Sequence, residues 1–426
     1  MALTRDSSGA LCYGRLTLRD VARRYGTPAY VYDLDGMAER ARALELGFEG
    51  APHLVAYAVK ANTAGAVIRT LAAEGCGADV VSGGELRVAL ACGVAPERIV
   101  YSGVAKQDDE LDQAIACGAR GIAAVQVESV EEIARVEARA RAAGRTARVG
   151  VRINPGIDLG DATHAHIATG HDEAKFGVPL DDVARAVALA EASPHLALVG
   201  MAVHAGSQLK SVGPYLDAAR VLLDWVRASR ASGALRSLEY VDTGGGFGVD
   251  YGEGPATAAA DFVRAVRAEQ RQRGLEDLAL FVEPGRSLVA ASGVLLARVL
   301  QVKVAQAARW LMLDAGMNDL VRPALYQARH RILPLDAEVP PDDALDWRVV
   351  GPVCESSDDF GAHLLPREPP AMVAILDAGA YGYTMASRYN GRQLPVEVFV
   401  RGDVVVGATE RVSVESWAEE RARAGG

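Results

Sequence analysis

A lysine stands at the end of an apolar run that is typical of a buried strand. Lys60 follows residues 54–59 in the segment Tyr57-Ala58-Val59-Lys60-Ala61-Asn62. Lysine is seldom fully buried, and a desolvated ammonium has a lowered pKa that suits a nucleophile or a Schiff base. On this stretch alone, a lysine whose amine reaches solvent from a strand end is the favoured interpretation.

Three other chemistry-bearing segments also follow apolar runs. They are His204-Ala205-Gly206-Ser207-Gln208, Asp242-Thr243-Gly244-Gly245-Gly246 and Glu283-Pro284-Gly285-Arg286. A triple glycine between a strand and a helix lets backbone N–H groups approach an anion, which a helix N-terminus also favours. A tight turn requires glycines as well. The spacing differs from G-x-x-x-x-G-K-[ST], so a nucleotide P-loop is not supported.

Eight aliphatic runs alternate with stretches of helical spacing, such as residues 131–143 and 181–192. The alternation predicts parallel strands joined by crossover helices, and the count favours a closed (β/α)8 barrel of the TIM type over an open, doubly wound sheet. From about Ser292 the pattern changes to short β-rich segments. We predict a barrel over residues 28–290 and a second, β-rich domain from residues 1–27 and 291–426. The runs are 54–59, 78–81, 99–102, 122–127, 149–153, 196–204, 238–242 and 278–283.

Placement at strand ends changes the weight of these motifs, because catalytic groups of such barrels lie at the carboxyl ends of the strands and phosphate sites follow strands seven and eight. A lysine and a phosphate site on one face suggest pyridoxal 5'-phosphate (PLP), whose aldehyde binds a lysine and whose ring acts as an electron sink. Glu283 can keep the ring nitrogen protonated, or it can pair with Arg286. His204 can stack on the ring, or it can be a core histidine.

Composition restricts the class of partner. The 426 residues carry a formal net charge of −10, which argues against nucleic acid and anionic membranes and favours a small molecule. The five cysteines form no C-x-x-C pair, and the chain has neither a signal-type apolar segment near its start nor an apolar run of about 18 residues. We expect a cytoplasmic protein without a membrane segment.

The long connection 154–179 contains His164 and His166, but we expect no metal there. A loop of this length can also act as a lid.

Together the motifs resemble those of the fold-type III PLP-dependent decarboxylases, whose fold is that of alanine racemase and ornithine decarboxylase. The similarity extends from about Thr27 to Val400 and is greatest to the members that act on meso-diaminopimelate. It is carried by residues 57–62, 204–208, 244–246, 283–286, Met317-Asn318-Asp319, Arg322-Pro323, Tyr326, Cys354-Glu355-Ser356 and Asp377-Ala378-Gly379-Ala380-Tyr381.

The resemblance implies a role for each matching position. Lys60 would carry the cofactor, His204 would stack on its ring and Glu283 would face the pyridine nitrogen. The substrate's distal carboxylate would be held by Arg286, Arg322 and Tyr326, and its distal ammonium by Glu355. Cys354 would be the catalytic proton donor. Around the cofactor phosphate and the substrate would lie Ser207, Gly244, Gly245, Gly246, Gly285, Arg286 and Tyr381.

The resemblance further implies a homodimer with shared active sites, in which Cys354 and Glu355 come from the partner chain. The expected reaction is decarboxylation of meso-2,6-diaminopimelate to L-lysine and CO2, the last step of lysine biosynthesis. Two departures bear on substrate preference and the interface, namely Ser357 where the family commonly has glycine and Leu394 where it has a second arginine. The alternatives are a decarboxylase of ornithine, arginine or lysine, an amino-acid racemase, and a non-catalytic regulatory protein that binds the cofactor.

Overall fold

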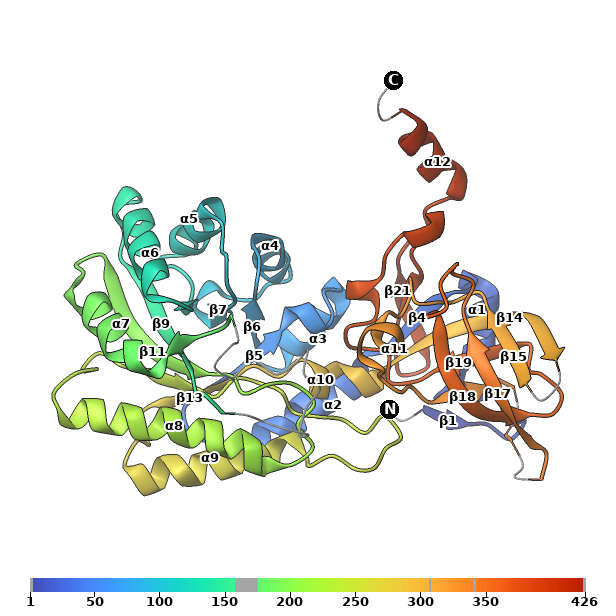
Figure 1. Cartoon of the computed structure of the whole chain (residues 1–426), viewed down its shortest axis with the longest axis horizontal. Helices are drawn as coiled ribbons and strands as arrows, with labels where there is room; N and C mark the ends of the chain where they lie inside the picture. The colour runs from blue at the N-terminus through green and yellow to red at the C-terminus, as the bar shows by residue number, and fades with distance from the viewer. Residues whose placement is uncertain (1–2, 158–174, 306–307, 337, 340–341, 424–426) are drawn as a thin grey trace. The chain divides into compact units, whose positions relative to one another are not determined.

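The computed structural model describes residues 3–157, 175–305, 308–336, 338–339 and 342–423 (Figure 1). The chain divides into two compact units. The barrel unit consists of Ala38–Val249 and Pro255–Leu288, and the β unit consists of Met1–Met37, Asp250–Gly254 and Val289–Gly426. The domain boundaries at residues 28 and 290 stay a prediction.

Eight parallel strands of the described residues close into a ring in the barrel unit. Each strand pairs with its neighbour in chain order, and β13 pairs with β5 to close the circle. The (β/α)8 prediction and all eight strand positions are thereby confirmed. The strands are β5 (His53–Ala58), β6 (Gly77–Val80), β7 (Ile99–Tyr101), β8 (Ala124–Val127), β9 (Ala147–Asn154), β11 (Leu196–Val203), β12 (Tyr240–Asp242) and β13 (Ala279–Val282). A short β10 (Val178–Pro179) pairs with β9 outside this ring.

Aliphatic and aromatic side chains fill the interior of the ring, which explains why its strands are nearly continuous apolar runs. Tyr240 stacks on Phe281 with ring centroids 4.0 Å apart, and both pack against Ala124 and Val199. A Cβ at Gly200 would lie 2.0 Å from Cζ of Tyr240, so only glycine fits beside that ring.

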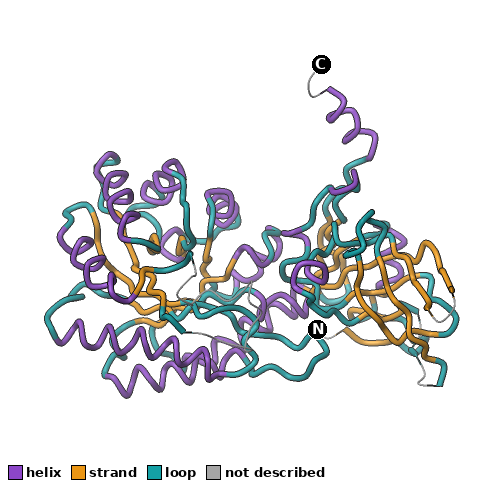
Figure 2. Tube along the Cα trace, viewed as in Figure 1, coloured by secondary structure: helices purple, strands orange, loops and turns teal. Residues whose placement is uncertain are grey.

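Helices surround the strands of this unit (Figures 1 and 2). Serine caps start two of them: Ser82 Oγ accepts the Glu85 N–H, and Ser129 Oγ accepts the Glu132 N–H, both at 3.2 Å. The helices predicted at 131–143 and 181–192 are correct to within one residue. The helices are α2 (Leu34–Glu45), α3 (Gly65–Ala73), α4 (Gly83–Ala91), α5 (Asp108–Ala116), α6 (Val130–Ala142), α7 (Leu180–Ala192), α8 (Val212–Ala231), α9 (Ala259–Arg273) and α10 (Arg286–Val289).

The β unit is built on a sheet in the order β18-β17-β15-β14-β4-β20-β21, with β19 on β14 and β16 on β19. Its core includes Val31, Leu296 and Val398, which come from three distant parts of the sequence. The strands are β4 (Ala29–Asp33), β14 (Gly293–Ala305), β15 (Ala308–Leu313), β16 (Ile332–Pro334), β17 (Ala344–Val350), β18 (Asp359–Pro366), β19 (Met372–Ile375), β20 (Val396–Arg401) and β21 (Val404–Ala408). The second, β-rich domain predicted from the sequence is thus present.

Smaller elements complete the β unit. Strands β1 (Leu3–Arg5), β2 (Leu11–Tyr13) and β3 (Leu16–Thr17) form a separate sheet, and α1 (Leu18–Tyr25), α11 (Arg322–Tyr326) and α12 (Val414–Arg423) are its helices. Within the described ranges, no helix is both long and apolar enough to cross a membrane. Most of the predicted 154–179 loop, with His164 and His166, lies outside those ranges.

Candidate active site

The Lys60 amine pairs with a buried carboxylate at the carboxyl end of the barrel strands. Lys60 lies in a short 3-10 turn (Val59–Ala61) directly after β5, and its Nζ donates to Asp79 Oδ2 at 2.7 Å. Asp79 exposes none of its side chain, whereas Lys60 exposes 40%. The amine is therefore oriented by a fixed charge and still accessible. The pairing favours a positioned amine over a lysine that simply extends into solvent.

The turn that carries Lys60 is fixed by local hydrogen bonds and by a close glycine contact. The Tyr57 hydroxyl donates to the Asn62 carbonyl at 2.9 Å, and the Ala58 N–H donates to the Pro284 carbonyl at 3.0 Å. A Cβ at Gly285 would lie 3.1 Å from the Ala58 Cβ. Residues 283–286, which follow β13, thus pack directly on the turn that carries Lys60.

Two further carboxyl groups, those of Glu283 and Asp242, are embedded near Lys60. Ser102 Oγ donates to Glu283 Oε1 at 3.1 Å, and the Gly244 N–H donates to Asp242 Oδ1 at 2.8 Å. Desolvation raises the pKa of Glu283 well above its usual range, and the neighbouring charges of Asp242 and Asp79 raise it further. Desolvation also raises the pKa of Asp242 to about 7. This group of carboxyls is suited to a cationic N–H, such as that of a protonated pyridine ring.

His204, directly after β11, is a neutral imidazole. The Gly245 N–H donates to its Nδ1 at 3.1 Å, so Nδ1 carries no hydrogen. Desolvation, and then the charges of Arg152 and Lys60, lower the pKa of His204 well below its usual range. An uncharged ring fixed through one nitrogen offers a flat face for stacking.

The triple glycine forms a turn in which every Cβ is excluded. A Cβ would lie 2.4 Å from His204 Nδ1 at Gly244, 2.0 Å from the Glu283 carbonyl oxygen at Gly245, and 2.1 Å from the Gly206 carbonyl oxygen at Gly246. The loops after β11, β12 and β13 therefore meet backbone to backbone. One expectation is wrong: α9 begins only at Ala259, so no helix N-terminus follows the glycines directly.

Arg286 and Ser207 connect the loops after β13 and β11. Arg286 Nη2 donates to Ser207 Oγ at 2.9 Å, and the arginine is only 7% exposed. All the barrel residues predicted from the sequence therefore lie at one end of the strands. They are Lys60, His204, Ser207, Gly244, Gly245, Gly246, Glu283, Gly285 and Arg286.

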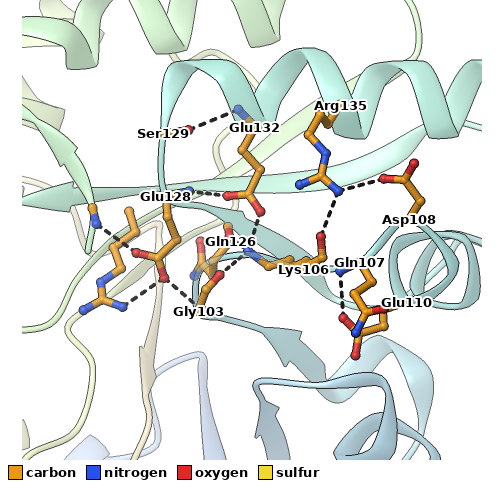
Figure 3. Close-up of polar contacts among 12 residues, drawn as sticks. Gly103, Lys106, Gln107, Asp108, Glu110, Gln126, Glu128, Ser129, Glu132 and Arg135 are labelled. Carbon is orange, nitrogen blue, oxygen red and sulfur yellow. Dashed lines mark hydrogen bonds and ion pairs between the residues drawn. The ribbon is translucent and has the colours of Figure 1, made fainter. Parts of the chain in front are cut away.

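A network of buried charges supports the same face from β7, β8 and β9 (Figure 3). Lys106 Nζ donates to Glu132 Oε1 at 2.9 Å and to the Gln126 carbonyl at 2.7 Å. Glu128 accepts from Arg152 Nη1 at 3.0 Å and from the Gly177 N–H at 2.8 Å. Sequence reasoning missed Arg152 and Asp79. A signal was available, because each is a charge inside an apolar strand run, and such a charge requires a partner.

The remaining predicted residues lie in the β unit. Arg322 and Tyr326 begin and end α11. Cys354 and Glu355 lie on an exposed loop, where the Cys354 N–H donates to Asn390 Oδ1 at 2.8 Å and Glu355 Oε1 accepts from the Tyr389 hydroxyl at 2.5 Å. Tyr381 adopts a left-handed conformation with φ of 56°. The structure places these residues in one unit.

Comparison with known proteins agrees with this geometry. Residues 34–290 match the family described as "Pyridoxal-dependent decarboxylase, pyridoxal binding domain". Diaminopimelate decarboxylase of Zymomonas mobilis is 41% identical over 418 residues, which cover 96% of this chain and 96% of that protein.

Solved structures agree over nearly the whole length. Diaminopimelate decarboxylase of Helicobacter pylori, complexed with L-lysine, superimposes with a TM-score of 0.87 at 36% identity, over 95% of this chain and all of that chain. The enzyme of M. jannaschii, in co-complex with L-lysine, gives a TM-score of 0.90 at 33% identity, over 98% of this chain and 97% of that one. The chain therefore belongs to the family of pyridoxal-dependent decarboxylases, and within it to the diaminopimelate decarboxylases.

Proposed function

We propose that this chain is a PLP-dependent carboxy-lyase that converts meso-2,6-diaminopimelate to L-lysine and CO2, the last step of lysine biosynthesis. One observation carries the proposal: an accessible Lys60 amine, paired with Asp79, lies at the same strand ends as neutral His204 and the buried carboxyl of Glu283. The relatives that match this chain over nearly their full length are diaminopimelate decarboxylases, which supports the choice of substrate.

The barrel residues fit PLP by their chemistry. Lys60 supplies the amine that holds the cofactor, and His204 offers an uncharged ring face. The embedded carboxyl of Glu283 matches the ring N–H. We assign the phosphate to the turn Gly244, Gly245 and Gly246 with Ser207, Gly285, Arg286 and Tyr381. When bound, PLP supplies an electron sink for the pair released as CO2 departs.

Asp79 and Glu283 then have separate tasks. Asp79 accepts a hydrogen bond from Lys60 Nζ, so it would orient the amine and share its proton whenever the amine is free. With the cofactor bound, the Glu283 carboxylate would stabilise a protonated ring nitrogen, because a nearby negative charge favours the charged form of a base. His204 carries no charge that would compete with either group.

The substrate's second amino-acid head requires both a cation and an anion. We assign its carboxylate to Arg286, Arg322 and Tyr326 and its ammonium to Glu355, and we count Tyr381 among the substrate-binding residues. A guanidinium binds a carboxylate through two parallel hydrogen bonds, and a carboxylate binds an ammonium. This pairing selects a substrate with a second carboxylate and a second amine.

Cys354 is the proposed proton donor to the carbon that loses CO2. We propose that it acts with Glu355 in the site of a second copy, so that a homodimer shares two active sites. Support comes from the surface position of both residues. The Asp358 carboxylate also fixes the base of their loop, because it accepts the Val353 and Met317 N–H groups at 2.6 Å.

We also propose a cytoplasmic location, since all five cysteines are free thiols.

The rival substrates differ by one group. Ornithine, lysine and arginine have no second, distal carboxylate. With any of them as substrate, Arg322 and Tyr326 would have no anion to bind. A racemase or a regulatory protein would need Lys60 but would not use Cys354 and Glu355. These residues favour the diaminopimelate reaction.

A substrate panel tests the proposal. Purified protein with PLP is given meso-diaminopimelate, ornithine, lysine and arginine in turn, and CO2 and amine products are measured. We expect the highest kcat/KM for meso-diaminopimelate, with one L-lysine formed per CO2. Fastest turnover of ornithine would refute the substrate, and the absence of CO2 from all four would refute the activity.

The carboxyl group of Asp242 also predicts how the apoprotein responds to pH. Its pKa of about 7 in the fold exceeds the value of about 3.9 expected for an unfolded chain. Between these values the native state binds the extra proton, so stability falls as pH rises, by at most about 1.4 kcal/mol per pH unit for each proton retained. We expect Asp242→Asn to flatten the decline of Tm between pH 5 and 7.

Asp224→Asn is the matched control for this measurement. Asp224 hydrogen-bonds to Arg273, which lowers its pKa, so its charge does not change between pH 5 and 7. An unchanged slope in Asp242→Asn, or a flattened slope in the control, would contradict the account.

A further inference from the structure

The Arg322 guanidinium is held from two sides by side chains of the β unit. Its Nη1 lies 2.7 Å from His330 Nε2, and its Cζ lies 4.6 Å from the centroid of the Tyr251 ring. None of the three residues is more than 4% exposed. A buried guanidinium with two such contacts has few orientations open to it.

The two hydrogen bonds of His330 assign its tautomer. Nδ1 lies 2.8 Å from the Leu376 carbonyl oxygen, which can only accept, so Nδ1 carries the hydrogen. In a neutral imidazole the other nitrogen is then an acceptor, and Nε2 receives the N–H of Arg322. The imidazole thus transmits the position of a backbone carbonyl to the guanidinium.

That carbonyl belongs to a well-anchored strand end. Leu376 follows β19, and its N–H donates to the Arg331 carbonyl at 2.8 Å. Arg331 in turn binds Asp377 through two nitrogens, with Nε to Oδ2 at 3.0 Å and Nη2 to Oδ1 at 2.9 Å. The segments on both sides of the His330 imidazole are therefore tied together.

Tyr251 comes from residues 250–254, which fold with the β unit although they lie between β12 and α9 in the sequence. Asp250 Oδ1 accepts the N–H groups of Gly252 and Glu253 at 2.6 and 3.0 Å, which closes a tight turn. The Tyr251 ring lies edge-on to the His330 ring at 5.2 Å. The aromatic face that covers Arg322 is thus itself fixed.

We propose that His330 and Tyr251 are positioning residues that aim the Arg322 guanidinium at the second carboxylate of the substrate. The inference rests on the proposed function, in which Arg322 binds that carboxylate. A fork onto a carboxylate requires a defined guanidinium plane. Loss of one charge-assisted hydrogen bond to the carboxylate weakens binding about tenfold or more.

L-lysine and cadaverine form a matched ligand pair for the test, because cadaverine is lysine without its carboxylate. Inhibition constants for both are measured on the PLP-loaded enzyme, together with kcat and KM for meso-diaminopimelate. For His330→Phe we expect the L-lysine constant and the KM to rise about tenfold or more, with the cadaverine constant unchanged and kcat reduced less than KM is raised. Arg322→Ala serves as the reference for complete loss of the contact.

Two variants and one control separate positioning from packing. His330→Gln retains one donor and one acceptor in its carboxamide, so it is expected to recover much of the affinity for L-lysine. Tyr251→Leu removes the ring face and is expected to act like His330→Phe, and it carries the test if His330→Phe does not fold. His363→Gln replaces another buried histidine of the β unit, whose Nε2 contacts the Phe360 carbonyl at 2.9 Å, and should change neither constant.

The outcomes distinguish this inference from the proposed function. If the wild-type enzyme does not act on meso-diaminopimelate, the proposed function fails. If it does, but His330→Phe or Tyr251→Leu weakens L-lysine and cadaverine equally or neither of them, only the positioning role is overturned.

Discussion

Replacing Lys60 with alanine is expected to lower the rate of decarboxylation by about 10³-fold or more, because it removes the amine that we assign to the covalent attachment of PLP. The absorbance of lysine-bound cofactor should disappear with it. The variant should also unfold at a lower temperature, since Asp79 exposes none of its side chain and would lose its charged partner. The measurements are CO2 release, the visible spectrum with PLP and Tm.

Lys303→Ala is the matched control, because Lys303 lies in the β unit, 5.3 Å from the Trp310 ring centroid. It should keep both the spectrum and the rate. A Lys60→Ala protein that retains the spectrum of bound cofactor and more than a tenth of the rate would contradict the assignment.

Replacing Glu283 with glutamine is expected to lower kcat by about 10²- to 10³-fold, with little change in the amount of PLP bound. A neutral amide can accept the hydrogen bond of Ser102 but cannot balance the charge of a protonated ring. Desolvation, and then the charges of Asp242 and Asp79, raise the pKa of the wild-type carboxyl, so a cationic partner would offset both the burial and the repulsion. Single-turnover rates with saturating meso-diaminopimelate measure the effect.

Glu283→Asp and Ser102→Ala provide the comparison. The first keeps the charge and should fall between the wild type and Glu283→Gln. The second removes only the 3.1 Å hydrogen bond to Oε1 and should cost less than Glu283→Gln. Equal rates in Glu283→Gln and the wild type would remove the role of the carboxylate at the ring.

Local sequence signals predicted the barrel well and indicated which candidate residues lie together at one end of it. The parallel strands are buried on both faces, so each appears as an aliphatic run, and Lys60, His204 and Glu283 stand out as the first polar residues after three of them. Parallel strands that close into a barrel have all their carboxyl ends on one face. Position at a strand end was therefore enough to group these residues.

Features that depend on distant pairing were not predictable in the same way. Strand β4 pairs with β14 and β20, hundreds of residues away, and residues 250–254 fold with the β unit although barrel elements flank them. The apolar residues 396–406 belong to two strands, β20 and β21, that are separated by a turn. The burial of Asp79 beside Lys60 required the register of β5 on β6.

The most direct test of the central claim is to locate the lysine that carries PLP. The PLP-loaded protein is reduced with borohydride, which makes the attachment permanent, and its peptides are mapped by mass spectrometry. We predict that Lys60 alone is modified. When meso-diaminopimelate is added before the reduction, we predict that Lys60 is no longer modified. Modification of Lys106, Lys175, Lys210 or Lys303 in place of Lys60 would contradict the account.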